Sequence, residues 1–360
     1  MNKSCFKYHY QQIITGIAKL SDTISALNDV ELSSEERSNV VNDVLQVMDG
    51  AISVVVSSDK AGGGNITSTR HLICSVLNTS NSLSNFALRN VESGSASVVF
   101  NTPSVQLKLE SNAVENLTGG FEALRDGNGF SIPPARKILR NVTAEVEVNK
   151  IMVYLNRSSF QMEDDTSNKL VTDILSLSFT DKGGNDLEVT DPAEGLQITF
   201  ATNLPESAAD LTIKGTYLEE ANITNFISNI TIAEPDQAVI ISLKSSESIY
   251  GNTTAYVFNK MVDYSDSYRG YQFSVDVQFE GDHSKVFIPE RYFLRNGVYY
   301  LSFAIKHRHV AKFSIAIKQT KCSSLGKGNR RWSTDKCKVS SASNMTSTVC
   351  LCHLLRDPKP

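Results

Sequence analysis

Hydrophobic residues in roughly the first 85 positions recur every three or four residues, which is the spacing of one face of an α-helix. A first run holds Ile13, Ile17, Leu20, Ile24 and Leu27. A second run holds Val40, Val41, Val44, Leu45, Met48 and Ile52. A third run holds Leu72, Ile73, Val76, Leu77 and Leu83. These stripes predict three helices that pack together through their apolar faces.

The start of the second predicted helix carries a capping signal. In Ser33-Ser34-Glu35-Glu36 a serine stands three residues before a glutamate, so Ser33 can accept from the amide of Glu36 while Glu36 reaches back. Between the second and third helices, the segment Ser58–Thr69 contains three consecutive glycines. This composition predicts a flexible loop.

From about residue 96 the hydrophobic period changes to two, which indicates β-strands. Turn signals separate the runs, for example at Asp126–Gly129, Lys182–Asp186 and Arg295–Gly297. Many short strands without helices between them predict an antiparallel sandwich or barrel. The fold class is therefore α+β, with a helical subdomain at 1–95 and a β-sandwich subdomain at 96–360. The alternating residues are Val105, Leu107 and Leu109; Ala144, Val146 and Val148; Ile151, Val153 and Leu155; Leu196, Ile198 and Phe200; Phe273, Val275, Val277 and Phe279; and Phe313, Ile315 and Ile317.

Charge and hydropathy exclude several classes of protein. A net charge of −4, from 35 basic and 39 acidic residues, argues against a surface that binds nucleic acid or anionic lipid. The longest apolar runs, such as Ala238–Leu243, are strand-sized and far shorter than a membrane-spanning helix. Lys3, Lys7 and His9 interrupt any signal-peptide core. We therefore expect a soluble globular piece, or a piece cut from a longer protein, that does not insert into the membrane by itself.

Four of the six cysteines gather near the end of the sequence, at Cys322, Cys337, Cys350 and Cys352. Their spacing is C-x14-C-x12-C-x-C, which lacks the short CxxC or CxxxxC pairs of zinc fingers and ribbons. Two disulfides are therefore favoured over a zinc site. Cys5 and Cys74 stand alone, and whether they pair with each other stays open.

Ten Asn-x-Ser/Thr triplets without proline support an extracellular protein, although each triplet alone is a weak match. A missing signal peptide then indicates that the start of a longer protein has been left out. The acceptor asparagines are Asn2, Asn65, Asn78, Asn116, Asn141, Asn156, Asn222, Asn229, Asn252 and Asn344.

Catalytic patterns are scarce in this sequence. His307 and His309 would share one strand face and could bind a metal together, but a third ligand is not evident and an exposed polar face is favoured. Glu163-Asp164-Asp165 lacks the twelve-residue calcium-loop pattern, so a solvated acidic loop is favoured there. We expect no metal, no cofactor and no enzyme acting on an external substrate.

The cysteine-rich segment 322–355 resembles the G-protein-coupled-receptor proteolysis site, the last piece of a GAIN domain. Trp332-Ser333-Thr334-Asp335 before Cys337 is similar to the tryptophan core of that site, with Lys336 in place of the usual glycine. Thr348–Cys352 is similar to its second half. Phe130–Pro134 and Val286–Ile305 resemble the polycystin and receptor-for-egg-jelly branch more than adhesion receptors.

This resemblance implies a helical subdomain followed by a twisted β-sandwich that ends in the proteolysis site. It implies the disulfides Cys322–Cys350 and Cys337–Cys352, with Trp332 packed beside them. Family members cleave themselves at His-Leu-Thr/Ser, where the hydroxyl attacks the preceding carbonyl and the histidine acts as general base.

The sequence departs from the family at that tripeptide. Cys352 is followed by His353-Leu354-Leu355-Arg356. Aligned without a gap, Leu354 takes the position of the histidine and Arg356 that of the nucleophile. With one deletion, His353-Leu354 fit and Leu355 takes the nucleophile position. Neither register supplies a hydroxyl or a thiol, so we expect no autoproteolysis.

Together these features indicate a non-cleaving extracellular GAIN-like module next to the membrane in a polycystin-type protein. It would couple the ectodomain mechanically to the membrane part, and its partners would be the rest of that protein and extracellular ligands or matrix. One alternative is an autoproteolytic GAIN domain of an adhesion-type receptor whose true C-terminus is missing. Another is a secreted adhesion or ligand-binding protein.

Overall fold

The computed structural model describes residues 3–27, 30–58, 66–89, 91–117, 119–156, 172–189, 195–202, 211–214, 216–218, 223–232, 234–245, 253–258, 271, 273–305, 312–325 and 332–353. The chain divides into two compact units. Unit 1 comprises Met1–Phe200, Leu325–Ser333 and Cys352–Pro360, and unit 2 comprises Ala201–Ser324 and Thr334–Leu351.

Unit 1 begins with the three predicted helices, α1 (Lys3–Leu27), α2 (Ser34–Ser58) and α3 (Ile66–Leu88). The predicted capping box is confirmed: the amide of Glu36 donates to Ser33 Oγ at 3.2 Å, and the amide of Ser33 donates to Glu36 Oε2 at 2.8 Å. The predicted loop Ser58–Thr69 is shorter than expected, because α3 already begins at Ile66. Residues 59–65 lie outside the described residues.

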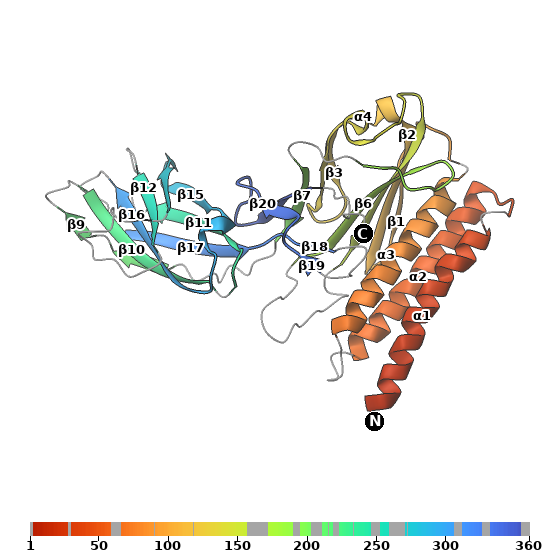
Figure 1. The fold of residues 1–360 in the computed structure, drawn as a ribbon, viewed down its shortest axis with the longest axis horizontal. Helices are drawn as coiled ribbons and strands as arrows, with labels where there is room; N and C mark the ends of the chain where they lie inside the picture. Colours follow the sequence, from red (N-terminus) through yellow and green to blue (C-terminus); the bar gives the residue numbers. More distant parts are fainter. Residues whose placement is uncertain are drawn as a thin grey trace. The chain divides into compact units, whose positions relative to one another are not determined.

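The helices cover one face of a four-stranded antiparallel sheet (Figure 1). Its strands, in the order β1-β2-β5-β6, are β1 (Val98–Asn101), β2 (Val105–Ala113), β5 (Glu147–Leu155) and β6 (Ile174–Asp181). Leu107, Leu109, Ile151 and Val153 point from this sheet into the core of the helices. Helices and sheet therefore share one hydrophobic core.

The other face of this sheet packs against a second layer. That layer contains the antiparallel strands β3 (Gly120–Ala123), β4 (Gly129–Ile132) and β7 (Leu196–Ala201), with the short helix α4 (Ala135–Ile138) beside them. Val148 and Met152 of β5 meet Phe130 and Leu196 in its core. Strand β5 is consequently buried on both faces.

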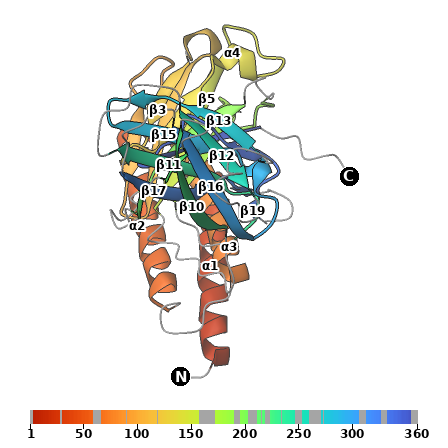
Figure 2. The same ribbon diagram turned by 90° about the vertical axis from the view of Figure 1, so that its left-hand side faces the viewer.

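Unit 2 contains two five-stranded antiparallel sheets. One has the order β13-β12-β16-β10-β9 and the other the order β14-β15-β11-β17-β8. Their inner faces contribute Phe226, Leu301 and Phe303 from the first sheet and Ile241, Val286 and Ile315 from the second to one core. Figure 2 separates β12, β16 and β10 from β15, β11 and β17. The predicted β-sandwich is thus present.

The strands of unit 2 have the following bounds. The first sheet holds β9 (Thr216–Leu218), β10 (Ile223–Ile232), β12 (Thr253–Phe258), β13 (Phe273–Val277) and β16 (Gly297–Ile305). The second holds β8 (Leu211–Lys214), β11 (Ala238–Ser245), β14 (Phe279–Glu280), β15 (His283–Ile288) and β17 (Lys312–Thr320). The last strands of the chain are β18 (Ser324–Leu325), β19 (Trp332–Ser333), β20 (Cys337–Val339) and β21 (Ser347–Cys352).

The predicted change from helices to strands lies where expected, since α3 ends at Leu88 and β1 begins at Val98. The predicted domain boundary at residues 95/96 does not separate compact units, however, because the division falls between Phe200 and Ala201. The physical reason is the core that α1–α3 share with β2 and β5, which joins the helices to the first strands. Among the described residues, no helix has the length and apolar character needed to cross a membrane.

Candidate functional site

The cysteine-rich end of unit 2 is fastened by a disulfide. Cys322 follows β17 and Cys350 lies in β21, and their sulfur atoms are bonded with Cα atoms 5.7 Å apart. Both cysteines are 3% exposed. Beside them, the hydroxyl oxygens of Thr320 and Thr348 are 3.2 Å apart. The disulfide therefore ties the end of β17 to β21 inside the protein.

Cys337 in β20 and Cys352 at the end of β21 are also disulfide-bonded, which gives two disulfides near the C-terminus. The bond Cys322–Cys350 is the one that the resemblance implies. The oxidised state of Cys337 and Cys352 agrees with the second implied pair. A zinc site formed by these cysteines is incompatible with this chemistry, because thiolates and not disulfides bind zinc.

A tight loop connects β20 to β21, and its own side chains shape it. The Asn344 Oδ1 atom accepts from the amides of Thr346 and Ser347 at 2.9 and 2.7 Å. The Ser343 hydroxyl accepts from the amide of Val349 at 2.8 Å. Short polar side chains thus supply hydrogen-bond partners to the backbone of this loop.

Two lysines hold this loop against the second sheet of unit 2. Lys318 on β17 donates to the Thr202 hydroxyl at 2.8 Å and to the carbonyl oxygens of Asn344 and Ser347 at 2.9 and 3.0 Å. Lys285 on β15 donates to the carbonyl oxygens of Ser341 and Ser343. The loop is thereby tied to β15 and β17 through its carbonyl groups.

Burial changes the charge behaviour of these lysines. Lys318 is 3% exposed, and this burial lowers its pKa to about 8. Burial lowers the pKa of Lys285 as well. The three acceptors named for Lys318 are uncharged, so their hydrogen bonds offset only part of the cost of burying an ammonium group and no negative charge in that set offsets the rest.

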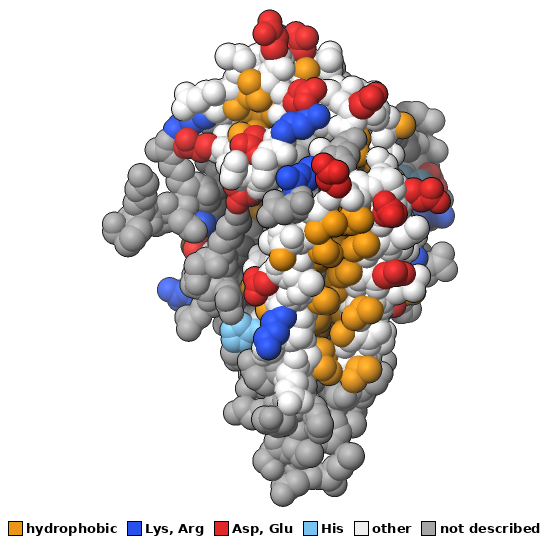
Figure 3. All heavy atoms as spheres, turned by 90° about the vertical axis from the view of Figure 1, so that its right-hand side faces the viewer, with side chains coloured by type: hydrophobic (Ala, Val, Ile, Leu, Met, Phe, Trp, Pro, Cys, Tyr) orange, Lys and Arg blue, Asp and Glu red, His pale blue; other side chains and the backbone are white. Residues whose placement is uncertain are grey.

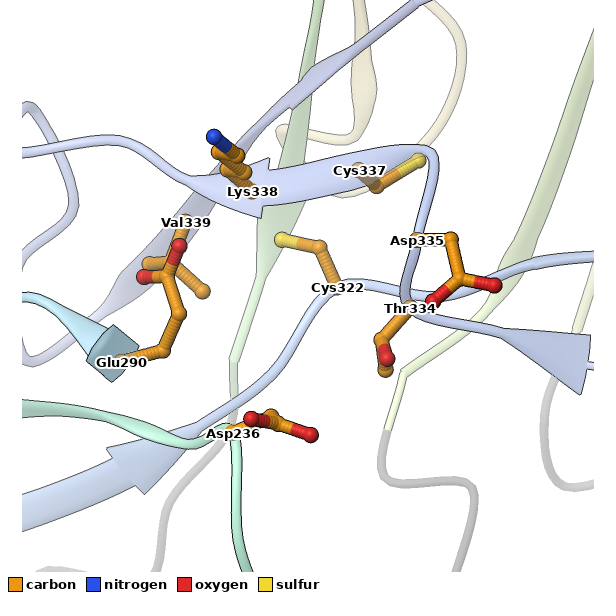
Figure 4. Close-up of a pocket in the computed structure, with 8 residues that line it drawn as sticks. All are labelled: Asp236, Glu290, Cys322, Thr334, Asp335, Cys337, Lys338 and Val339. Atoms are coloured by element: carbon orange, nitrogen blue, oxygen red, sulfur yellow. The ribbon is translucent and has the colours of Figure 1, made fainter. Parts of the chain in front are cut away.

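A hollow of about 220 Å³ opens beside the disulfide (Figure 4). Its lining includes three carboxylates, from Asp236, Glu290 and Asp335, together with Lys338. The Glu290 Oε2 atom is buried and has no hydrogen-bond partner among the described residues. In the part of the chain that the structure describes, no group of three His, Cys, Asp or Glu side chains could hold a metal ion.

The predicted cleavage remnant is only partly visible. His353 follows β21 and is exposed, whereas Leu354, Leu355 and Arg356 lie outside the described residues. Trp332 belongs to β19, but its side chain is not described. The candidate metal residues His307 and His309 and the acidic segment 163–165 also lie outside the described residues.

Five predicted glycosylation acceptors are exposed: Asn78, Asn116, Asn141, Asn229 and Asn344. Asn156 is half-buried and donates through Nδ2 to the Pro103 carbonyl at 3.2 Å. The remaining acceptors lie outside the described residues, and these are Asn2, Asn65, Asn222 and Asn252.

Sequence reasoning missed Lys318 and Lys285. The carbonyl groups that bind Lys318 lie 26 and 29 residues away along the chain, and those that bind Lys285 lie 56 and 58 residues away. A lysine on an alternating strand normally marks a solvated face, so the local pattern holds no signal that a loop covers it.

Comparisons with known proteins assign no family. No family model matches the chain, and no curated protein matches it. Among solved structures, the full extracellular region of zebrafish Gpr126/Adgrg6 matches with 12% identity and a TM-score of 0.38, covering 94% of this chain and 34% of that one. The chain thus spans about a third of that structure's length.

Two further solved structures match with lower TM-scores. One is the pre-peptidase C-terminal domain of a collagenase from Bacillus anthracis, with 16% identity, a TM-score of 0.19, and coverage of 30% of this chain and 89% of that one. The other is the collagen-binding domain of Erysipelothrix rhusiopathiae surface protein RspB, with 13% identity, a TM-score of 0.20, and coverage of 73% of this chain and 94% of that one. Scores this low carry no argument about function.

Proposed function

We propose that this chain is an uncleaved, GAIN-like structural module of the extracellular part of a polycystin-type membrane protein. It would carry mechanical load between the ectodomain and the membrane part, and it would catalyse no reaction of an external substrate. The observation that carries the proposal is the double fastening of β21, by the Cys322–Cys350 disulfide and by the lysine-held loop before it.

Two chemical features support an extracellular location. Buried disulfides persist in oxidising compartments and are rare where thioredoxin and glutathione keep thiols reduced. Asn-x-Ser/Thr triplets function only on proteins that enter the secretory route, and five of those in this chain present exposed asparagines.

The path that a pulling force would take supports the proposed mechanical role. Tension applied beyond β21 reaches Cys350 and passes through a covalent bond to Cys322, at the end of β17. Strand β17 lies between β11 and β8 in its sheet, so the load enters a strand that is paired on both sides. The force is then carried by the covalent Cys322–Cys350 bond and not by the hydrogen bonds of the β20–β21 loop.

The absence of a nucleophile after Cys352 supports an uncleaved module. Acyl transfer to a side chain needs a hydroxyl or thiol beside the scissile carbonyl, and His353-Leu354-Leu355-Arg356 contains neither. An uncleaved chain keeps the covalent route from the ectodomain to whatever follows β21.

The first test is the intact mass of the secreted, deglycosylated chain, measured under denaturing conditions with and without reduction. A single full-length species that gains four hydrogens on reduction, after allowing for Cys5 and Cys74, supports the proposal. Release of a C-terminal peptide on denaturation would instead favour the autoproteolytic alternative.

The second test pulls single molecules by their ends in the oxidised and reduced states. The sequence separation of 28 between Cys322 and Cys350 is hidden while the disulfide is intact. Full reduction should therefore lengthen the extended chain by about 90 to 100 Å, from roughly 3.3–3.6 Å per residue. Equal extended lengths in both states would contradict the proposed load path.

A further inference from the structure

Strand β10 presents an Asn-x-Ser/Thr triplet on the outer face of the first sheet of unit 2. Phe226 and Ile230 of this strand point into the core of the sandwich. Because side chains alternate along a strand, Asn229 and Thr231 point to the other side, and both are exposed. The acceptor amide and the hydroxyl of the triplet therefore lie on the same accessible face.

Asn229 differs from other predicted acceptors in the surroundings of its triplet. Among the described residues, its side chain makes no hydrogen bond. The Oδ1 atom of Asn344 instead accepts from two loop amides, and the Nδ2 atom of Asn156 donates to a backbone carbonyl. The triplet of Asn78 has its hydroxyl on Ser80, which is 0% exposed. At Asn229 a free side-chain amide and an exposed hydroxyl occur together.

An aromatic ring lies directly opposite this acceptor. Asn229 pairs with Tyr300 across β10 and β16, and Tyr300 is half-buried. Its neighbours Tyr299 and Leu301 belong to the core, so Tyr300 points outward, to the same side as Asn229. Directly opposed side chains in an antiparallel pair have Cβ atoms about 4.5 to 5.5 Å apart. A group attached to the Nδ2 atom of Asn229 therefore begins beside the Tyr300 ring.

Further aromatic and apolar side chains continue this surface. Tyr256 of β12 is opposite Ser302, which places it diagonal to Tyr300 on the same face. The rings of Tyr256 and Tyr271 have centroids 4.9 Å apart, and Tyr271 is 45% exposed. Val298 of β16 is also 45% exposed. We call the outward positions of β10, β12 and β16, which include Asn229 and Tyr300, the outer face.

The outer face has no charge of its own. None of the described outward positions of β10, β12 and β16 holds an acidic or basic residue. On the next strand, β13, Asp276 accepts from the Thr254 hydroxyl at 3.1 Å. The Ser302 hydroxyl donates to Asn225 Oδ1 at 2.7 Å. Aromatic rings among neutral hydroxyl and amide groups suit a neutral sugar better than a charged protein surface, which needs opposite charges.

The exposed valines of α2 lack this combination. Figure 3 shows an elongated apolar patch along the helices of unit 1. On α2, Val47 is 60% exposed and Val54 is 55% exposed. Helix α2 contains no Asn-x-Ser/Thr triplet, so nothing on it identifies what covers these valines. The outer face of unit 2, in contrast, carries its own attachment point.

We propose that Asn229 carries an N-linked glycan whose first N-acetylglucosamine packs on Tyr300 and covers the outer face. One side of the sugar ring presents C–H groups that stack on an aromatic ring, and its hydroxyl groups suit the polar neighbours. Because the sugar is attached beside Tyr300, packing costs it little further entropy. The glycan stabilises the β10–β16 pair and keeps other chains off this face.

The attachment requires a lipid-linked oligosaccharide diphosphate as the glycosyl donor. The Nδ2 atom of Asn229 bonds to the anomeric carbon of the donor and loses one proton. The bond between that carbon and the diphosphate oxygen breaks, and the lipid diphosphate leaves. This inference rests on the extracellular location within the proposed function, and on neither the load path nor the absence of cleavage.

Site occupancy is measured first. The full chain is secreted from mammalian cells, and its glycopeptides are identified by mass spectrometry. We expect Asn229 to be modified in most molecules. An unmodified Asn229 beside modified acceptors elsewhere would overturn the inference and leave the extracellular location intact. No modification at any acceptor would contradict both.

A cycle of variants tests the packing on Tyr300. An endoglycosidase trims every glycan to one N-acetylglucosamine, and Asn229→Gln supplies the form without it. Amide hydrogen exchange in peptides from β10 and β16 should be slower with the sugar by roughly threefold to tenfold, the range for one aromatic stacking contact. Tyr300→Thr should remove this difference, whereas Tyr300→Phe, which keeps a ring, should retain it. Asn78→Gln removes an acceptor on α3 and should leave exchange in β10 and β16 unchanged.

A second measurement does not depend on the folding of the Tyr300 variants. In the trimmed protein with isotope-labelled glycans, the acetyl methyl signal that Asn229→Gln removes belongs to the sugar on Asn229. The Tyr300 ring current should shift this signal away from its position in free N-acetylglucosaminyl-asparagine. A signal at the position of the free compound, or slower exchange that Tyr300→Thr leaves unchanged, would overturn the proposal.

Discussion

Replacing both Cys322 and Cys350 by alanine should destabilise unit 2 without destabilising unit 1. Alanine keeps the Cβ atom and adds no polar group to a site that is 3% exposed. The change therefore removes mainly the covalent link between β17 and β21. Its principal effect is to increase the conformational entropy of the unfolded chain.

The size of the effect follows from the length of the loop that the bond closes. A sequence separation of 28 corresponds to a loss of about 3.5 kcal/mol at 25 °C in the chain-entropy treatment. A second crosslink that halves the effective length of the loop lowers this loss of stability by only about 0.6 kcal/mol, because the loop-closure free energy depends on the logarithm of the loop length. With typical urea m-values, the loss corresponds to a midpoint shift of roughly 1 to 3 M.

Hydrogen exchange read by mass spectrometry can separate the two units during urea titration. Peptides that cover β11 and β17 should lose protection at lower urea in the variant, whereas peptides that cover β2 and β5 should not change. Cys74→Ala is the matched control, because Cys74 lies on α3 of unit 1 and takes no part in the Cys322–Cys350 bond. A loss below about 1 kcal/mol, or equal losses in both units, would refute the reasoning.

Three further predictions concern local features. Ser33→Ala should lower the free energy of unfolding by about 1 kcal/mol and speed amide hydrogen exchange in the first turn of α2. Hydrogen bonds from the Ser33 amide and hydroxyl lower the pKa of Glu36. The contribution of this carboxylate to stability should therefore be complete above its ordinary pKa of 4.5 and be lost as the pH falls through its pKa in the folded protein. Gly127→Ala should lower the melting temperature, since Gly127 has φ +77°, whereas Gly50→Ala in α2 should raise it or leave it unchanged. Burial lowers the pKa of Lys318 from its ordinary 10.5 to about 8. As the pH increases from 8 to 10.5, the free energy of unfolding should therefore rise relative to that of Lys318→Met. A difference between the two proteins that does not change with pH would contradict the titration of Lys318 as its cause.

Local features could be predicted from the sequence because their partners are neighbours in the chain. The Ser33–Glu36 box spans three residues, and both of its hydrogen bonds are present. The turn at Asp126-Gly127 needs two residues with positive φ, and these have φ of 52° and 77°. Such signals are complete within a few residues, so no knowledge of tertiary packing is required.

Features that depend on both sides of a sheet could not be predicted in the same way. The sequence suggests separate alternating runs at Ala144–Val148 and Ile151–Leu155, but the structure has one strand from Glu147 to Leu155. Ile151 and Val153 face the helices while Val148 and Met152 face the second layer. The alternation of apolar and polar residues along a strand shows which side chains are apolar. It does not show whether a further layer of the protein covers the second face of the sheet.

The candidate site shows the same limit. The cysteine cluster and its oxidised state could be predicted from spacing and resemblance, because cysteines are rare and chemically distinctive. Lys318 and Lys285 could not, since their acceptors are backbone carbonyl groups that any residue supplies. A backbone acceptor leaves no trace in the amino-acid sequence.

The division of the chain into units also sets an order of events during synthesis. Unit 1 takes its last segments from Leu325 onward, after all of Ala201–Ser324 of unit 2 has emerged from the ribosome. At roughly 5 to 20 residues per second, the earlier part of unit 1 waits on the order of 10 s for them. Cys5 and Cys74 are synthesised well before that interval, whereas Cys322 and Cys350 come late. Formation of the Cys322–Cys350 bond can thus begin only after Ala201–Ser324 has emerged, which makes it a late step in the folding of unit 2.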